Sequence, residues 1–216
     1  PLIKKVLPST LYSIWGFKIF ANIIAGIWEI LSIFLGKLVY LAFMIVGVSA
    51  MYEGVPQDAL FLHIFLFLTV IGAYMNTYLF NPTQDKYYSI ILLRMNAREL
   101  SLLDYGYHMI KLLVGFLPFT IYFGQQFGVP LWLSILIPFS IASLKMVMAY
   151  FTLRSYEKTG EASGENQLGK SVWLVTGLLL AAAYLPPAFG LVLPLPMVAA
   201  LLVGILPFGL WSLHKI

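Results

Sequence analysis

The sequence predicts an all-α integral membrane protein with an amphipathic entry helix, about six transmembrane helices and both termini in the cytoplasm. The chain of 216 residues is 61% hydrophobic and only 10% charged, whereas soluble domains carry about 25% charged residues. Its apolar residues gather in long runs, and a spanning helix needs about 20 such residues. Its 13 Lys and Arg residues are placed as if they all faced one side of a membrane, which is the positive-inside pattern.

The basic residues alternate with turns that carry neither Lys nor Arg. Those turns are Met51–Asp58, Gln125–Pro130 and Leu185–Pro196. We therefore expect a multi-pass protein of the cell membrane, with these three turns outside and the basic segments in the cytoplasm. The basic positions are Lys4, Lys5, Lys18, Lys37, Lys86, Arg94, Arg98, Lys111, Lys145, Arg154, Lys158, Lys170 and Lys215.

The N-terminal region, residues 1–29, is predicted to be an interfacial entry helix. Its polar residues Lys18, Asn22 and Glu29 lie near one face at helical spacing, which suits a helix lying on the membrane surface. A separate span over Ser13–Gly36 is the alternative. That extra crossing would move the later basic residues to the outer side, so we favour the surface helix.

The first span must then begin near Ile30. The apolar run Leu38–Met51 would be only about 21 Å long as a helix, and starting earlier places Lys37 inside the first two turns. The five further predicted spans are Ala59–Phe80, Ile110–Phe127, Leu131–Leu153, Ser171–Phe189 and Pro194–Leu213. All six belong to one transmembrane domain covering residues 1–216, with a flexible cytoplasmic loop at 154–170. The first residue is Pro1 and not Met, so whether the native chain extends before it stays open.

The segment 81–109 combines charge with amphipathicity. Asn81-Pro82 is predicted to end the preceding span, and apolar residues then recur at roughly helical spacing from Tyr88 to Tyr107. This indicates one or two short amphipathic helices at the inner surface, interrupted by a polar turn near Asn96. A plain basic loop that only sets topology is the alternative.

The run Leu93-Arg94-Met95-Asn96-Ala97-Arg98-Glu99-Leu100, followed by a span entered near Lys111, resembles the cytoplasmic segment of ABC-2-type transporter permeases. In that family an amphipathic entry helix precedes six spans, and the loop between the second and third spans docks onto an ATP-binding cassette subunit. The resemblance implies a permease of a bacterial ABC exporter, working as a homo- or heterodimer of permease halves. It implies ATPase-coupling roles for Arg94, Asn96, Ala97, Arg98 and Glu99.

One departure from that family bears on the cargo. The Leu185–Pro196 turn is too short for the outer helices that the family commonly carries there, which disfavours a large polysaccharide. The apolar composition favours an amphipathic, peptide-like or lipid-like cargo. Membrane lipid is an expected partner and nucleic acid is not.

Three polar residues within predicted helices are candidates for a pathway or gating role: Glu29, Asn76 and Lys145. Each has a simpler explanation. Glu29 would pair with Lys18 or Lys37 or stay exposed at the interface, Asn76 would hold neighbouring helices together, and Lys145 would snorkel or pair inside the bundle. His63 is predicted to be a hydrogen-bonded packing residue.

No motif for catalysis is present. The absence of G-x-x-x-x-G-K-[ST] means that ATP and Mg²⁺ are expected on the partner subunit and that this chain is not itself an enzyme. No metal site is expected from its scattered histidines, and no disulfide from a chain without cysteine. Two other classes stay open: a membrane enzyme acting on lipid through Glu29, Asp104 and His108, and an accessory or immunity protein.

Overall fold

The computed structural model describes residues 15–75, 84–160 and 170–215, and in these ranges the chain is helical with no strand. Six of the described helices are long and apolar enough to cross a membrane, so the chain is a multi-pass membrane protein. These spans are Trp15–Gly47, Gln57–Met75, Ala97–Gln126, Leu131–Thr159, Lys170–Ala188 and Leu195–Lys215.

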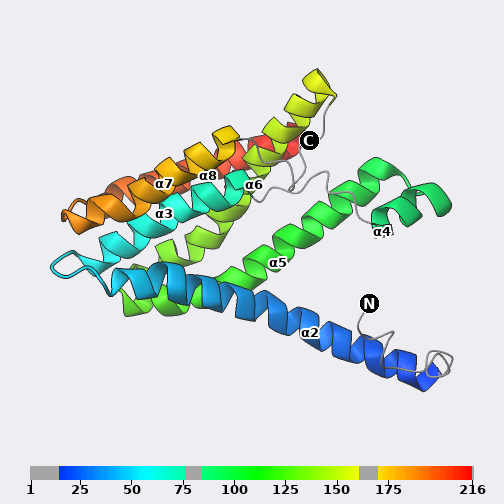
Figure 1. The fold of residues 1–216 in the computed structure, drawn as a ribbon, viewed down its shortest axis with the longest axis horizontal. Coiled ribbons are helices and arrows are strands. Elements are labelled where there is room, and N and C mark those ends of the chain that lie inside the picture. The colour runs from blue at the N-terminus through cyan, green and yellow to red at the C-terminus, as the bar shows by residue number, and fades with distance from the viewer. Residues whose placement is uncertain (1–14, 76–83, 161–169, 216) are drawn as a thin grey trace.

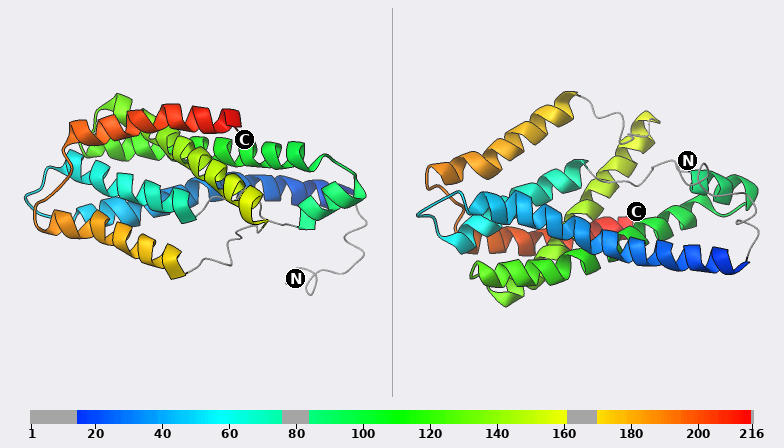
Figure 2. Two further views of the ribbon diagram at one scale, coloured as in Figure 1. Left: turned by 90° about the horizontal axis from the view of Figure 1, so that it is seen from above. Right: turned by 60° about the horizontal axis from the view of Figure 1, so that its bottom comes forward.

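The spans correspond to the labelled helices of Figure 1. The first joins α2 (Trp15–Leu41) to a π-helical segment, η2 (Ala42–Gly47), and the others are α3 (Gln57–Met75), α5 (Ala97–Gln126), α6 (Leu131–Thr159), α7 (Lys170–Ala188) and α8 (Leu195–Lys215). The short α4 (Gln84–Tyr87) and η3 (Tyr88–Leu92) lie at the end of the molecule where α2 and α5 begin (Figures 1 and 2).

The structure does not separate an entry helix from the first span. Residues 15–47 form one uninterrupted helical run, about 50 Å long at 1.5 Å per residue, against a hydrocarbon core of about 30 Å. The structure shows no break in the helix at the predicted division near Ile30. No proline interrupts the run. Glu29 is bound to a lysine of α5, and this pairing reduces the free-energy cost of placing its carboxylate within the membrane.

Two other helix ends differ from the prediction. The helix expected from Ile110 begins 13 residues earlier, at Ala97. It begins there because the Asn96 side chain caps it by accepting a hydrogen bond from the Arg98 N–H at 3.0 Å. The predicted loop at 154–170 begins later, since α6 continues to Thr159 and ends at Gly160, whose φ of +69° suits glycine. Residues 161–169 of that loop lie outside the described residues.

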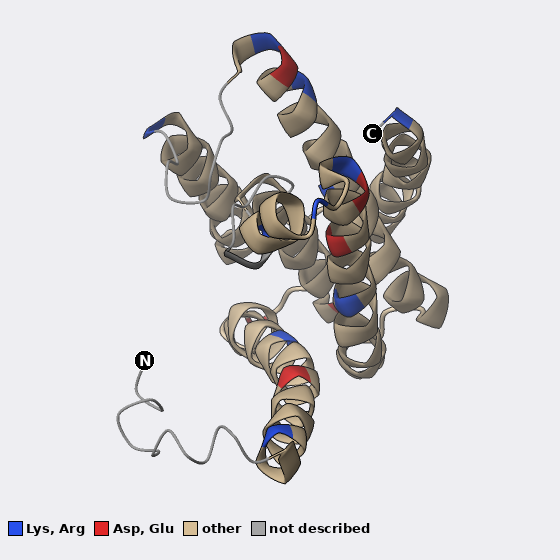
Figure 3. Ribbon diagram, turned by 90° about the vertical axis from the view of Figure 1, so that its right-hand side faces the viewer, with Lys and Arg blue, Asp and Glu red and all other residues tan. Residues whose placement is uncertain are grey.

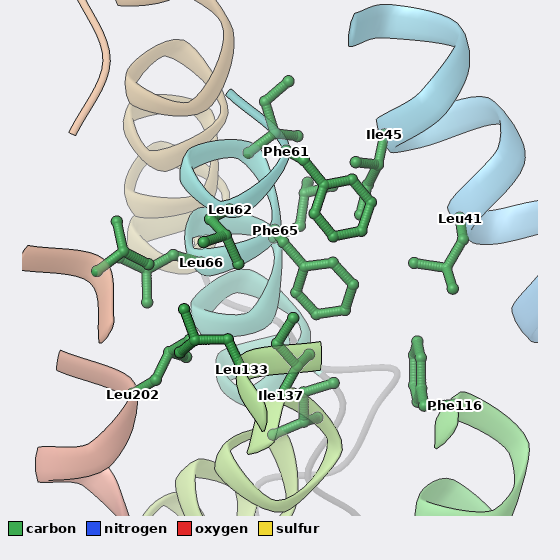
Figure 4. Packing of buried hydrophobic residues seen from close by; sticks show 14 of the residues in the cluster. Leu41, Ile45, Phe61, Leu62, Phe65, Leu66, Phe116, Leu133, Ile137 and Leu202 are labelled. Carbon is green, nitrogen blue, oxygen red and sulfur yellow. The ribbon is translucent and has the colours of Figure 1, made fainter. Parts of the chain in front are cut away.

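The hydrophobic core lies between α2, α3, α5, α6 and α8. Phe61 and Phe65 of α3 stand at its centre (Figure 4), with Phe61 stacked on Phe127 at a ring-centroid distance of 5.2 Å. Phe65 meets Phe116 of α5 edge to face at 6.4 Å. Large buried partners from four other segments include Leu41, Ile45, Leu133, Ile137 and Leu202.

The predicted packing role of His63 is confirmed. The side chain is 3% exposed, and its Nδ1 accepts a hydrogen bond from the Leu193 N–H at 3.2 Å. Because Nδ1 is the acceptor, Nε2 carries the proton and donates to the Ala182 carbonyl at 3.0 Å. One imidazole thus joins α3 to α7 and to the turn between α7 and α8.

Candidate coupling segment and cationic cavity

The segment Gln84–Asn96 forms a small helical projection at one end of the molecule. After η3 the chain turns through Arg94, whose φ of +52° is the left-handed value, and enters α5 at Ala97. A salt bridge of 2.7 Å between Lys86 Nζ and Asp104 Oδ2 holds the projection against α5. We call residues 84–96 the projecting segment.

The five predicted coupling residues meet at the junction of the projecting segment with α5. Arg94, Asn96, Ala97, Arg98 and Glu99 are all exposed. Glu99 lies in the first turn of α5, where a carboxylate interacts favourably with the helix dipole. The predicted interruption near Asn96 is confirmed, and the turn presents charged side chains next to exposed apolar ones: Tyr87, Tyr88, Ile91, Leu92 and Leu93.

This end of the molecule is also the basic end. In Figure 3, which looks at it, Lys and Arg occur on several helix ends around the bundle. They include Lys18 near the start of α2, Lys158 near the end of α6 and Lys170 at the start of α7. The connections at the opposite end, 48–56, 127–130 and 189–194, contain no Lys or Arg. The charge asymmetry of the sequence is therefore an asymmetry between the two ends of the helices.

A cavity of about 610 Å³ lies between α2, α3, α5 and α6. Its volume falls within the range of about 300–1,000 Å³ that is usual for small-molecule sites. The apolar part of its wall comes from Ile33, Phe65, Leu68, Met109, Leu112, Phe116 and Ile141. The polar part comes from Ser32, Lys37, Tyr40, Thr69, Tyr105, His108, Lys111 and Lys145.

The cavity borders the hydrophobic core at the end away from the basic residues. Phe65 and Phe116 line it there and belong to the core beyond it. Toward the basic end it reaches the surface, since its wall includes the exposed residues Ser32, Gly36 and His108. The bundle is therefore packed across one end and hollow on the side that carries the projecting segment.

Three lysines of the cavity wall differ in their surroundings. Lys111 forms a salt bridge with Glu29 of α2, and Tyr107 donates a hydrogen bond to the same carboxylate at 2.9 Å. Lys37 lies 4.8 Å from the centre of the Phe116 ring, in a cation–π arrangement. Lys145 stands on α6 and lines the same cavity.

The structure separates the three predicted pathway candidates. Lys145 lines the cavity, whereas Glu29 lies beside it and is bound to Lys111. The expected partners of Glu29, Lys18 and Lys37, are therefore wrong, because α2 packs in parallel on α5 and brings residue 29 next to residue 111. Asn76 lies outside the described residues.

Sequence reasoning missed that Lys37, Tyr105 and Lys111 belong to the same cavity as Lys145. A signal existed, because Ser32, Ile33, Gly36, Lys37 and Tyr40 repeat at spacings of three and four and so share one face of α2. The sequence did not reveal which helix that face would meet.

The residues considered for a lipid enzyme come together only in part. Asp104 Oδ1 lies 3.4 Å from His108 Nδ1, one helical turn away on α5, but Glu29 is bound to Tyr107 and Lys111. No group of three or more possible metal ligands occurs in the described ranges. None of the family models, curated proteins and solved structures compared with this chain matches it.

Proposed function

We propose that this chain is the membrane permease subunit of an ATP-driven transporter of the ABC type, driven by a separate ATPase subunit. The ATPase would dock on the projecting segment and on the first turn of α5. Its closure would then move α5 and change access to the cavity. ATP and Mg²⁺ would be bound by the partner, and a second permease half would complete the transporter.

The observation that supports this proposal best is the continuity of α5. One helix of 30 residues runs from the exposed turn at Asn96 to the cavity wall, which it enters at Tyr105 and follows to Phe116. A force on its first turn would therefore be transmitted to the cavity without an intervening loop. A basic loop whose only role is topology needs neither this helix nor the salt bridge between Lys86 and Asp104.

The contact with the partner would be made by charged and apolar groups together. Arg94 and Arg98 can form charge-assisted hydrogen bonds with carboxylates of an ATPase, and the exposed Leu92 and Leu93 can enter an apolar groove. The concentration of Lys and Arg supports a cytoplasmic position for this end, where ATP is available.

The cargo would be amphipathic and exported from the cytoplasmic side. The cavity wall combines ammonium groups with apolar side chains of four helices, and the packed core beyond Phe65 and Phe116 separates it from the opposite end. This arrangement corresponds to an inward-facing permease.

Replacing Arg98 by Glu tests the proposal. The tagged chain is purified from membranes of its host, and co-purifying proteins are identified by mass spectrometry and assayed for Mg²⁺-dependent ATP hydrolysis. We expect an ATP-binding cassette protein with the native chain, and at least a tenfold loss of its affinity with Arg98→Glu, equivalent to about 1.4 kcal/mol.

Arg154→Glu is the matched control, since Arg154 is also exposed near the basic end but lies on α6, away from the projecting segment. It should retain the ATPase. The coupling assignment is wrong if Arg98→Glu binds the partner as tightly as the native chain. The transport proposal is wrong if the native chain carries no ATP-binding cassette protein.

A further inference from the structure

We propose that the projecting segment and the first half of α2 are alternative partners of one face of α5. In the structure the projecting segment holds that face through Lys86. When it is released, residues 15–29 of α2, which we call the α2 arm, close onto α5 and cover the mouth of the cavity. The exchange rests on the packing of these three elements, whereas its use in a transport cycle rests on the proposed function.

The first argument is the register in which α2 and α5 already pack. Glu29 binds Lys111, which lies 82 positions later in the chain, and Ile33 lies against Gly115 at the same separation. A Cβ added at Gly115 would meet Ile33 Cγ2 at 2.9 Å and the Ile33 carbonyl oxygen at 3.3 Å. The two helices therefore run parallel in one defined register and cross closely at this point.

The second argument is that the same face of α2 is open in the arm. The two helices diverge toward the basic end, as Figure 1 shows. Gly26 lies seven residues before Ile33 and so on the same face, but a Cβ added there would meet nothing within 4 Å. Lys18, Ile19 and Asn22 are exposed. The packing at Ile33 thus stops where the arm begins.

The third argument is that the two open faces fit each other in this register. Each level joins a bulky side chain with a small residue, or an amide with a carboxylate. Small residues are what allow helices in a membrane to approach closely, and Ile33 with Gly115 is already such a pair. The levels of the arm, at the separation of 82 positions, are Trp15 with Ala97, Ile19 with Ser101, Asn22 with Asp104, and Gly26 with His108.

Asp104 is the group for which the two partners compete. It lies seven residues before Lys111, on the same side of α5, and Lys86 of the projecting segment binds its carboxylate at 2.7 Å. The projecting segment therefore stands where the arm would pack. In the closed register Asn22 is level with Asp104 and Lys18 lies one turn before it. An amide and an ammonium group then replace Lys86 around the carboxylate.

Closing the arm covers the cavity. The exposed residues of the cavity wall are Ser32 and Gly36 of α2 and His108 of α5. In the closed register His108 packs on Gly26, which brings α5 against α2 directly beside this mouth. An ATPase that draws the projecting segment away from α5 would thereby allow the cavity to close.

The test measures closure in the purified chain in lipid nanodiscs, without an ATPase. Ile19→Cys and Ser101→Cys are combined in this cysteine-free chain and oxidised with copper phenanthroline. Thiols that remain reactive to a polyethylene glycol maleimide are counted over time. A disulfide needs Cα atoms about 4.4–6.8 Å apart, so its rate of formation reports closure. We expect Lys86→Gln to raise this rate at least fivefold, and Lys86→Arg, which retains the charge, to leave it within about twofold.

Two further variants separate closure from general loosening. Phe20→Cys with Ser101→Cys is the matched control pair, since Phe20 is exposed next to Ile19 but lies off the face that contains Gly26. This pair should react slowly with or without Lys86→Gln. Gly26→Leu should slow the Ile19–Ser101 disulfide at least fivefold, because it fills the space for His108. It should not lower the thermal unfolding temperature, because a Cβ there meets nothing in the open state.

An Ile19–Ser101 rate that does not change with Lys86→Gln would overturn the exchange. A control pair that reacts as fast as the Ile19–Ser101 pair would overturn the register. Covalent dimers formed by Ile19→Cys alone would show that a second copy covers the arm and would also overturn the proposal. Because no ATPase is present, failure of the transport proposal leaves these rates unaffected.

Discussion

The carboxylate of Glu29 acts as a connection between two helices. It forms a salt bridge with Lys111 and accepts a hydrogen bond from the Tyr107 hydroxyl. These three side chains join α2 to α5 at the edge of the cavity. Nothing in the sequence indicates that residue 29 meets residue 111, since the pair depends on two helices packing in parallel. The pairing also places Lys111 in the same cavity wall as Lys37, which lies about two turns farther along α2.

A charge swap tests this connection. Glu29→Lys and Lys111→Glu should each lower the thermal unfolding temperature in detergent micelles, because each places two like charges side by side. The double variant should recover most of the loss, because the opposite charges meet again with their positions exchanged. Circular dichroism at 222 nm is a suitable measurement. A double variant less stable than both single variants would contradict a direct pairing.

Several residue roles could be predicted from the sequence, and others could not. The packing role of His63 and the interruption at Asn96 follow from local rules, since a lone buried histidine needs partners and asparagine caps helices. The partner of Glu29 and the shared cavity of Lys37, Tyr105 and Lys145 depend on which faces of distant helices meet. Periodicity reveals such a face but not its neighbour.

At the scale of the element, helix continuity is the main difference from the sequence prediction. Hydropathy predicts that a span starts where the apolar residues begin, and for the third predicted span this position is Ile110. A capping residue sets the start of the helix itself, at Ala97. The 13 residues between these positions are what joins the projecting segment to the cavity wall in one helix.

Close packing of α6 and α8 gives the sharpest prediction at this scale. A Cβ added at Gly209 would lie 2.4 Å from Ser143 Cβ and 2.6 Å from its Cα, so the helices would have to separate. Gly209→Ala should therefore destabilise the fold by about 1–3 kcal/mol, as overpacking does. Chemical denaturation in micelles, monitored by tryptophan fluorescence, measures this change.

Gly204→Ala on the same helix is the control, since a Cβ there meets nothing within 4 Å. It should be neutral or slightly stabilising, because alanine favours a helix by about 0.5–1 kcal/mol over glycine. Equal effects of the two substitutions would mean that α6 and α8 do not approach this closely in the membrane.

At the scale of the whole molecule, the fold class follows from the sequence. Six apolar helices and a basic end were predicted from composition and charge placement, because the length and polarity requirements of a bilayer act locally. The cavity at the basic end and the packed core at the other end could not be predicted. They depend on how much the six helices separate along their length, and hydropathy does not report this separation.

The central proposal is that an ATPase acting at Arg94–Glu99, at the basic end of the molecule, changes access to the cavity by moving α5. Cysteine labelling is the most direct measurement, because the chain has no cysteine of its own. Gly72→Cys places one thiol in the cavity wall, at a position where a Cβ meets nothing within 4 Å. Ser155→Cys, exposed near the end of α6, is the control for general reactivity.

The rate of labelling by N-ethylmaleimide is compared in membranes with the ATPase nucleotide-free or trapped with Mg-ATP and vanadate. We expect trapping to slow labelling of Gly72→Cys at least fivefold, to leave Ser155→Cys unchanged, and to have no effect on Gly72→Cys when Arg98→Glu is also present. A Gly72→Cys rate that is the same in both nucleotide states would contradict the claim.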